Sequence, residues 1–445
     1  MINPLPITNP NLQGTPPAPD PKFAEVLRRE RQKSLLLRAW IVAGLFFMAI
    51  PGTLLGFSNL IAISTHHGLS SLSPAWIEGH GHAQMFGWIG SFILGIGFYS
   101  QPARGRQRLP LLCFLLWITG VTLRWGANIY GWHWRILLPV SAAMELIAII
   151  LFLIASSHHK IEPKREGAER PRIELWMATV LIGTAGLTLG VIFNFVECLR
   201  LAIAGIAPNF PHPLDQRYLV LLGWGFLVPF VWGFSARWFP AFLAVPAPSE
   251  RLLKSALAFV LLGVTAGLSG FPLVATPLLA TSALLIAPAL HLTERPRGRA
   301  KTIGIHPSFP VFIRLAYVWL VIAGAMSVWA AASDVHGGIW GAARHALTVG
   351  FAATMVFSIG PRILPHFSGV RALFSKRLML LSLVLLQLGC TIRVSSEPLA
   401  YEGILSFAWR TLPISGMIEL TAVLVFALNL GLTVVAGKSA FATAR

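Results

Sequence analysis

Two histidines, His82 and His345, are the residues of this sequence best placed to do chemistry. Each lies near the start of a long apolar segment, where an ionisable side chain is costly and is by default functional. Neutral imidazole is the commonest metal ligand in proteins, and two such rings can hold a haem iron from opposite sides. A structural role is the alternative, in which each ring bonds a nearby carbonyl or extends to the membrane interface.

The sequence around the two histidines is repeated. The glycines and the proline that follow recur at identical spacings: Gly87, Gly97 and Pro102 after His82, and Gly350, Gly360 and Pro365 after His345. Gly223 and Gly233 follow Tyr218 in the same way, without the histidine. This pattern predicts a unit of four helices, copied three times with a period of roughly 130 residues. We therefore expect His82 and His345 to face each other across the bundle, with their ligating nitrogens about 4 Å apart.

Small and cationic residues accompany the histidines. Gly87 and Gly350 leave room beside the helix backbone for a flat macrocycle, and equally for a closely packed helix. Arg344, Arg124 and Arg393 are expected at the same outer level of the membrane as the histidines. They either pair with haem propionates, which suits the forked guanidinium, or extend to lipid headgroups. In the first case we expect at least one within hydrogen-bonding reach of a propionate.

Two carboxylates also occupy matching places in the repeats. Glu145 lies in "WRILLPVSAAMEL" and Glu419 in "WRTLPISGMIEL". In a bilayer such groups must be paired or protonated. The sequence leaves open whether they are structural partners of the arginines or proton-relay groups.

Further histidines are expected on the outer side of the membrane. His66, His67 and His80 flank one short loop, and Met85 is close in sequence. Imidazole suits Cu(II) and thioether suits Cu(I), so this group is a candidate copper site. Solvated loop histidines are the alternative.

The elements that must position these residues are transmembrane helices. The chain has 445 residues, of which 55% are hydrophobic and 12% are charged. About twelve stretches are long enough to cross a bilayer, and a bilayer-spanning segment of this kind must be helical. They lie near 37–60, 75–99, 109–128, 134–156, 173–200, 216–241, 252–268, 271–292, 310–332, 338–360, 377–394 and 408–436. The predicted fold is an all-α polytopic membrane protein.

The basic residues predict how the chain is oriented. The net charge is +18, and most Lys and Arg lie in the N-terminal segment, in the loops after even-numbered helices and in the C-terminal tail. This asymmetry predicts that both termini lie in the cytoplasm. The basic loops then face anionic lipid, so their charge does not indicate a nucleic-acid role. We expect a flexible cytoplasmic tail at 1–35, four-helix repeats at 36–157, 172–292 and 310–436, and a cytoplasmic C-terminal tail at 437–445.

Several other kinds of site lack support in the sequence. The three cysteines, Cys113, Cys198 and Cys390, have no paired spacing that would indicate a disulfide or a metal site. The motifs for ATP hydrolysis, nicotinamide binding and zinc proteolysis are absent from the sequence.

Two motifs carry a resemblance to a known family. "HGHAQMFGW" and "HALTVGFAATM" resemble the NnrS family of twelve-helix bacterial membrane proteins, which contain haem and copper and are linked to nitric oxide and nitrosative stress. The resemblance implies a b-type haem, a possible copper ion and a place in the bacterial inner membrane. Ala83 follows the second histidine where the family has an acidic residue, so no proton or metal role of that carboxylate carries over.

The threefold plan is also similar to subunit I of the haem-copper oxidases. In those enzymes histidines on helices 2 and 10 hold a low-spin haem, as expected here for His82 and His345. Helices 6 and 7 of such enzymes supply further metal ligands, but the corresponding segments here contain no histidine. Oxygen reduction is therefore not expected, and whether the protein is an enzyme stays open.

Two alternatives to this hypothesis remain at the level of sequence. A secondary transporter without haem also has twelve helices with internal repeats and Gly- or Pro-interrupted spans, although its repeats are commonly twofold. A degenerate oxidase-like subunit would transfer electrons only. No soluble electron-transfer domain is recognisable in this sequence, so redox work would need a quinone or a partner protein.

Overall fold

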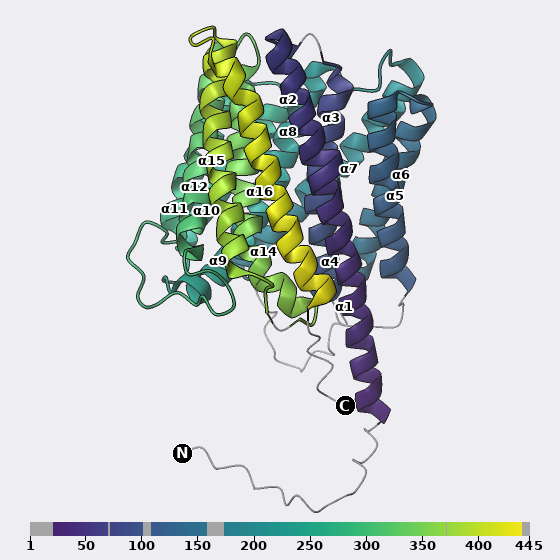
Figure 1. The fold of residues 1–445 in the computed structure, drawn as a ribbon, viewed down its shortest axis with the longest axis vertical. Helices are drawn as coiled ribbons and strands as arrows, with labels where there is room; N and C mark the ends of the chain where they lie inside the picture. The colour runs from purple at the N-terminus through teal and green to yellow at the C-terminus, as the bar shows by residue number, and fades with distance from the viewer. Residues whose placement is uncertain (1–20, 70–71, 101–107, 158–172, 371, 438–445) are drawn as a thin grey trace, which may run out of the picture.

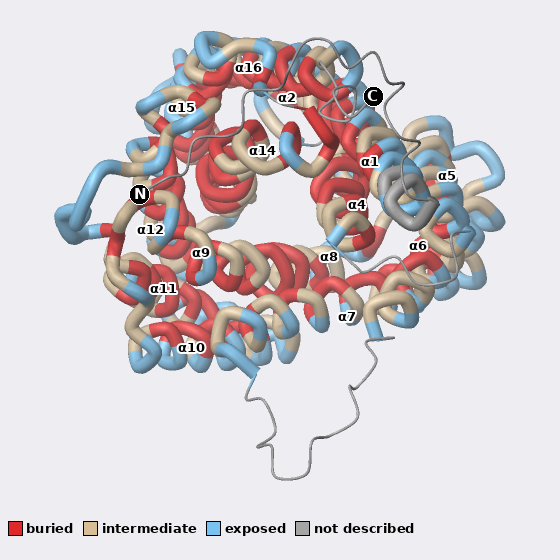
Figure 2. Tube along the Cα trace, turned by 90° about the horizontal axis from the view of Figure 1, so that it is seen from below, coloured by how far each residue is buried: buried red, intermediate tan, exposed pale blue. Residues whose placement is uncertain are grey.

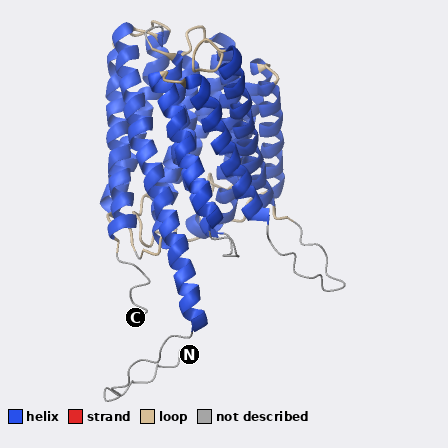
Figure 3. Cartoon of the chain, turned by 90° about the vertical axis from the view of Figure 1, so that its right-hand side faces the viewer, coloured by secondary structure: helices blue, strands red, loops and turns tan. Residues whose placement is uncertain are grey.

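The computed structural model describes residues 21–69, 72–100, 108–157, 173–370 and 372–437, and every regular element in these ranges is a helix (Figure 1, Figure 3). Many elements join end to end, so that they form twelve helical runs within the described ranges. In chain order these runs are α1 (Pro21–Phe47), η1 (Met48–Leu54) and α2 (Leu55–His66); α3 (Pro74–His82), η3 (Ala83–Gly90) and α4 (Ser91–Ser100); α5 (Arg108–Tyr130); α6 (Trp134–Ser157); α7 (Leu175–Ala204); α8 (His212–Val220), η4 (Leu221–Leu227) and α9 (Val228–Leu243); α10 (Glu250–Leu268); α11 (Pro272–Ala289); α12 (Phe309–Ser333); α13 (Gly338–His345), η5 (Ala346–Ala353) and α14 (Thr354–Phe367); α15 (Lys376–Tyr401); and α16 (Ala408–Ala436).

Eleven of these runs are long and apolar enough to cross a membrane. The run formed by α3, η3 and α4 is the one outside that group, because His80, His82 and Gln84 lower its hydropathy. The expected all-α architecture of about twelve apolar helices is thereby confirmed. So many apolar helices indicate a multi-pass membrane protein.

The first helix begins earlier than the sequence suggested. The segment 1–35 was expected to be a flexible tail, whereas α1 begins at Pro21 and extends beyond the rest of the bundle (Figure 1). Side-chain pairs one helical turn apart stabilise these exposed turns: Glu25 with Arg29, and Glu30 with Lys33. Residues 1–20 and 438–445, which include most of the two predicted tails, lie outside the described residues.

The helical runs form a ring with three runs nearer its centre. Viewed along the bundle, α4 and α14 lie inside the outer helices (Figure 2). The run from α8 to α9 and the run from α13 to α14 are also the most buried apolar spans, at 72% and 61% of their most apolar windows, against 28–50% for the other nine. His82 and His345 lie on two of these central runs.

Neighbouring helices pack in a recurring order. The antiparallel pairs α5 with α6, α10 with α11, and α15 with α16 make the most extensive contacts. Each central run packs against the run that precedes it in the chain: η3 and α4 against α1, η4 and α9 against α7, and α13 and η5 against α12. The ring is completed by α6 against α7, α11 against α12, and α16 against α2.

Four helical runs contain a π-helical segment. In η1 the cause is Pro51, which has no backbone N–H to donate and so disturbs the α-helical hydrogen-bond ladder. The other three segments, η3, η4 and η5, contain no proline and occupy the three central runs. His82 is the last residue of α3 before η3, and His345 is the last residue of α13 before η5. Short π-helical insertions occur frequently at functional sites.

Close helix packing against η4 leads to a prediction about stability. A Cβ at Gly186 of α7 would lie 2.2 Å from the carbonyl oxygen of Gly225, and neither backbone can move independently of its helix. We expect Gly186→Ala to destabilise the protein by about 1–3 kcal/mol, as overpacking does elsewhere. The measurement is thermal unfolding of the purified protein in detergent. Gly126→Ala in α5 is the control, because its Cβ would meet open space and alanine favours a helix. A Gly186→Ala variant as stable as Gly126→Ala would contradict the prediction.

Candidate functional site

His82 takes part in a buried network of hydrogen bonds with α6 and α7. Its Nε2 lies 2.7 Å from Oε1 of Glu145, and both side chains are almost completely buried. The second oxygen of Glu145 accepts a hydrogen bond of 3.1 Å from the side-chain amide of Asn194. A carboxylate only accepts hydrogen bonds, so Nε2 of His82 carries the proton and Nδ1 has the free lone pair. The ring of His82 also stacks on Phe86 with centroids 4.4 Å apart.

Arg124 of α5 connects this network to Cys198 of α7 and to Glu78 of α3. Its Nη1 donates to the sulfur of Cys198 at 2.7 Å, and its Nη2 donates to Glu78 at 3.1 Å. Cys198 in turn lies 3.6 Å from the side-chain oxygen of Asn194. The other oxygen of Glu78 accepts from the backbone N–H of Phe210. We call this set, Glu78, His82, Arg124, Glu145, Asn194 and Cys198, the Glu145 network.

His345 lies beside a second group of charged side chains. Its Nδ1 is 2.9 Å from the carbonyl oxygen of Gly341, which fixes the proton on Nδ1 and leaves the lone pair on Nε2. Glu397 of α15 lies 3.8 Å from the same Nδ1 and accepts a hydrogen bond of 3.0 Å from Arg393. Gly341 makes room for this carboxylate, because a Cβ there would lie 2.2 Å from Oε1 of Glu397.

His80 points to the side of α3 that faces η1 and α2. Its Nδ1 lies 2.9 Å from the carbonyl oxygen of Gly52, so its Nε2 also has a free lone pair. Gly56 provides the space, since a Cβ there would lie 2.6 Å from the imidazole ring. His80 and Arg393 are both close enough to His345 to act on it electrostatically. We call His80, His345, Arg393 and Glu397 the Arg393 network.

The two networks lie in different parts of the bundle and are not equally satisfied. The helices α5, α6 and α7 lie across the ring from α15 (Figure 2). In the Glu145 network both carboxylates have donors on both oxygens. On the α15 side, two buried carboxylate oxygens have no hydrogen-bond partner within the described ranges, Oε2 of Glu397 and Oε1 of nearby Glu419, whereas each network contains one arginine Nε without a partner, that of Arg393 and that of Arg124. Unpartnered buried polar atoms are costly, so they mark a place where a ligand would be stabilised.

His345 is held by its own helix and yet accessible. Its ring is held against α13 through Nδ1, while 26% of its side chain is exposed. The side chain of His82, in contrast, is 4% exposed. Free space therefore adjoins His345, whereas Phe86 and Glu145 fill the space around His82.

The two glycines proposed to face a macrocycle contact neighbouring helices instead. A Cβ at Gly87 would lie 2.7 Å from Phe47 of α1, and a Cβ at Gly350 would lie 2.6 Å from Trp319 of α12. Of the two roles considered for them, this geometry favours close helix packing.

The arginines turn inward. Arg124 is 2% exposed and Arg393 is 6% exposed, which excludes the extension of either side chain to lipid headgroups. Arg344 of α13 donates to Gln216 of α8 and so links two central runs. All three guanidinium groups are therefore available to the interior of the bundle.

The proposed copper ligands do not come together. His66 bonds the carbonyl oxygen of Ala62, His67 stacks on Trp409, and His80 bonds Gly52. In the part of the chain that the structure describes, no three His, Cys, Asp or Glu side chains are grouped so that they could hold a metal ion.

Several residues of these networks were not singled out in the sequence. Glu397 follows Arg393 by four residues, and Cys198 follows Asn194 by four, a spacing that places side chains on one face of a helix. That spacing could have indicated from the sequence that these side chains interact. Glu78 had no comparable signal, because its partners come from elsewhere in the chain.

Comparison with known proteins adds one partial match. A family model described as a domain of unknown function (DUF8744) matches residues 225–435, from η4 to α16. The matched part includes His345, Arg393 and Glu397 but not the histidines of α3. A search of the curated proteins finds no match to this chain.

Proposed function

We propose that this chain is a multi-pass membrane protein that binds haem, of the NnrS type, with both termini on the cytoplasmic side of a bacterial inner membrane. His345 would be one axial ligand and a histidine of α3 the other. The single observation that supports this most is the state of His345. It is anchored through Nδ1, its Nε2 lone pair is free, and accessible space lies beside it. A ligating histidine usually has its other ring nitrogen held in this way.

The threefold repeat that underlies this proposal has structural support. A π-helical segment occurs in each of the three central runs. In both outer repeats the same small contact recurs: a Cβ at Gly120 would lie 3.0 Å from Glu145, and one at Gly389 would lie 2.6 Å from Glu419. The helix pairs also pack in the same order three times. His82 and His345 are then equivalent residues of two repeats.

The residues around His345 fit a haem on chemical grounds. An iron ligand needs a free nitrogen lone pair, which Nε2 of His80 and Nε2 of His345 both have. Propionates need cationic donors in a low-dielectric interior, and Nε of Arg393 is buried without a partner. When bound between two histidines, haem would supply one-electron chemistry. The chain itself would hold the rings, neutralise the propionates and exclude lipid.

Two histidines of α3 compete for the second ligand position. Equivalence in the repeats favours His82, but its Nε2 is bonded to Glu145, so only Nδ1 is left for iron. Proximity to His345 favours His80. With His80 as the ligand, the Glu145 network would be a structural element that holds α3 in place.

The test is the absorption spectrum of the protein purified in mild detergent. A Soret band, with the sharp α and β bands of a low-spin haem after reduction, supports the proposal. A protein that contains no haem, even after expression with excess haem precursor, would contradict it. The identity of a bound haem follows from the pyridine haemochrome spectrum, for which we expect the b type.

A secondary transporter without haem is the second candidate. The observation in its favour is that charged side chains inside an apolar bundle, those of Arg393, Glu397 and Glu419, each have a polar atom without a partner, because such groups often line transport pathways. Absence of haem together with proton- or ion-driven uptake by vesicles containing the protein would support this alternative.

A further inference from the structure

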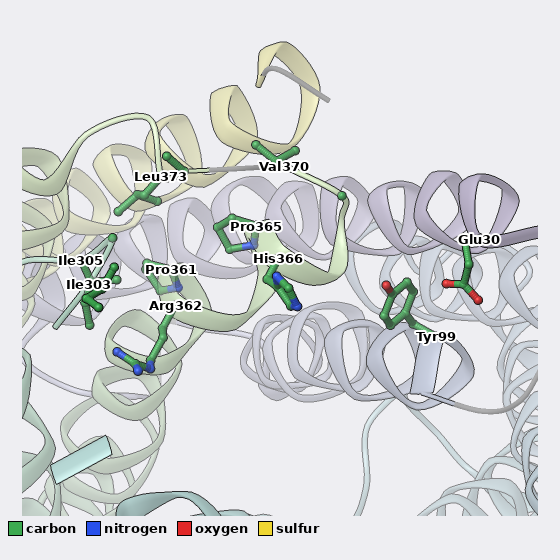
Figure 4. A pocket seen from close by; sticks show the side chains of 13 residues that line it. Glu30, Tyr99, Ile303, Ile305, Pro361, Arg362, Pro365, His366, Val370 and Leu373 are labelled. Atoms are coloured by element: carbon green, nitrogen blue, oxygen red, sulfur yellow. The ribbon is translucent and has the colours of Figure 1, made fainter. Parts of the chain in front are cut away.

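A pocket of about 560 Å³ lies beside the last turns of α14 (Figure 4). His345 lies near the opposite end of the same helical run. It lies between the last turns of α14, the end of α4, the first exposed turns of α1, and the loop that precedes α12. None of the residues discussed above as ligands lines this pocket. Its chemistry is therefore independent of the proposed haem site.

Two side chains of α14 supply cationic and hydrogen-bonding groups to this pocket. Arg362 and His366 are four residues apart, so they project from one face of the helix, as Figure 4 shows. The guanidinium of Arg362 lies over Phe242 at 4.0 Å, and its Nη1 donates to the carbonyl oxygen of Lys301. No carboxylate pairs with Arg362 in the described ranges. Its remaining N–H groups are free to bind an anion.

The one carboxylate on the lining does not cancel this charge. Glu30 lies at the far end of the pocket, beyond Tyr99, and pairs with Lys33 at 3.5 Å. The loop beside Arg362 is itself basic, with Arg295, Arg297, Arg299 and Lys301. The local field at the α14 end therefore favours a negative ligand.

Part of the pocket lining is apolar. Ile303, Ile305 and Leu373 lie together next to Arg362, and two prolines of α14 continue the surface (Figure 4). A soluble anion would gain nothing from such a wall, whereas an amphiphile would place its hydrocarbon there. The pocket lies at the end of the bundle that the positive-inside asymmetry assigns to the cytoplasmic leaflet, where anionic lipids gather.

We propose that this pocket binds the phosphate headgroup of an anionic phospholipid, with Arg362 as the main donor and His366 as a second one. The planar guanidinium, already held in place by Phe242 and Lys301, would form two parallel hydrogen bonds to phosphate oxygens. Ile303 and Leu373 would contact the glycerol and the first acyl carbons.

The experiment uses the full chain in detergent and native mass spectrometry. The probes are phosphatidylglycerol, phosphatidylcholine and glycerol 3-phosphate, each titrated against the wild type, Arg362→Gln and Arg377→Gln. Arg377 is an exposed arginine at the same end of the bundle that does not line the pocket, so its replacement removes the same charge. We expect phosphatidylglycerol to bind wild type about tenfold more tightly than it binds Arg362→Gln, since a charge-assisted hydrogen bond contributes this much or more. Arg377→Gln should bind within about twofold of wild type.

Three results would overturn the proposal. Equal binding of phosphatidylcholine would show that the headgroup charge is not recognised. Comparable binding of glycerol 3-phosphate would point to a soluble phosphate instead of a lipid. Equal losses in Arg362→Gln and Arg377→Gln would reduce the effect to general surface charge. If Arg362→Gln does not fold, Arg362→Lys is the substitute, because it retains the positive charge but cannot form two parallel hydrogen bonds to one phosphate. Binding of phosphatidylglycerol by Arg362→Lys as tight as by wild type would also contradict the proposed role of the guanidinium.

Discussion

His345→Ala is expected to abolish the low-spin haem spectrum of the purified protein. In the proposed site His345 is the ligand that both the repeat and the geometry of its ring indicate, and alanine supplies no nitrogen in its place. A single remaining imidazole would leave a five-coordinate, weakly held haem, so we expect the haem content to fall several-fold as well. The measurement is the ratio of Soret absorbance to protein concentration, together with the reduced spectrum. His336→Ala, at an exposed histidine shortly before α13, is the control and should retain haem.

The same experiment identifies the second ligand. If His80 binds iron, His80→Ala should lose the low-spin spectrum, and His82→Ala should retain it in a less stable protein. If the repeat-equivalent His82 binds iron, His82→Ala should lose the low-spin spectrum and His80→Ala should retain it, and iron would bind Nδ1 of His82 because Nε2 is bonded to Glu145. A low-spin haem that persists in His345→Ala would rule out His345 as a ligand in either case.

Arg124→Leu is expected to reduce the free energy of unfolding by about 3–5 kcal/mol, because it removes one partner of a buried ion pair. Glu78 would then have only the N–H of Phe210 as a donor, and the sulfur of Cys198 would lose its donor. The double variant Arg124→Leu with Glu78→Gln should recover part of this loss, since no unpaired carboxylate would remain. Thermal or denaturant unfolding in detergent gives the comparison.

Arg393→Leu separates stability from haem binding. It also breaks a buried pair, with Glu397, but Arg393 is close to both His80 and His345. We therefore expect the folded fraction of Arg393→Leu to show lower haem retention or a shifted redox potential, and the folded fraction of Arg124→Leu to show neither. Arg393→Leu and Arg124→Leu variants that are equally unstable and spectrally unchanged would contradict a propionate role for Arg393.

Much of the framework is determined by the sequence alone. The twelve helical runs lie close to the predicted segments, because a bilayer-length apolar stretch has only one way to satisfy its backbone. The helices that begin at Pro74 and Gly338 lie close to the predicted segments 75–99 and 338–360. A proline at the first helical position favours the first start, and Gly337, with its positive φ, precedes the second. The repeated spacing also singled out His82 and His345, each of which is the last residue of an α-helix before a π-helical segment.

The partners of those residues were decided only by the tertiary structure. Hydropathy and spacing determine where a helix begins and ends, but a polar side chain within it can face any of several neighbours. His82 bonds Glu145, 63 residues away, and Arg344 bonds Gln216, 128 residues away. A π-helical turn also adds a residue, which rotates everything after it by about 100° relative to a regular helix. Which face His80 or His82 presents to His345 therefore depends on how the helices rotate as they pack, and that rotation is set by contacts between helices far apart in the chain.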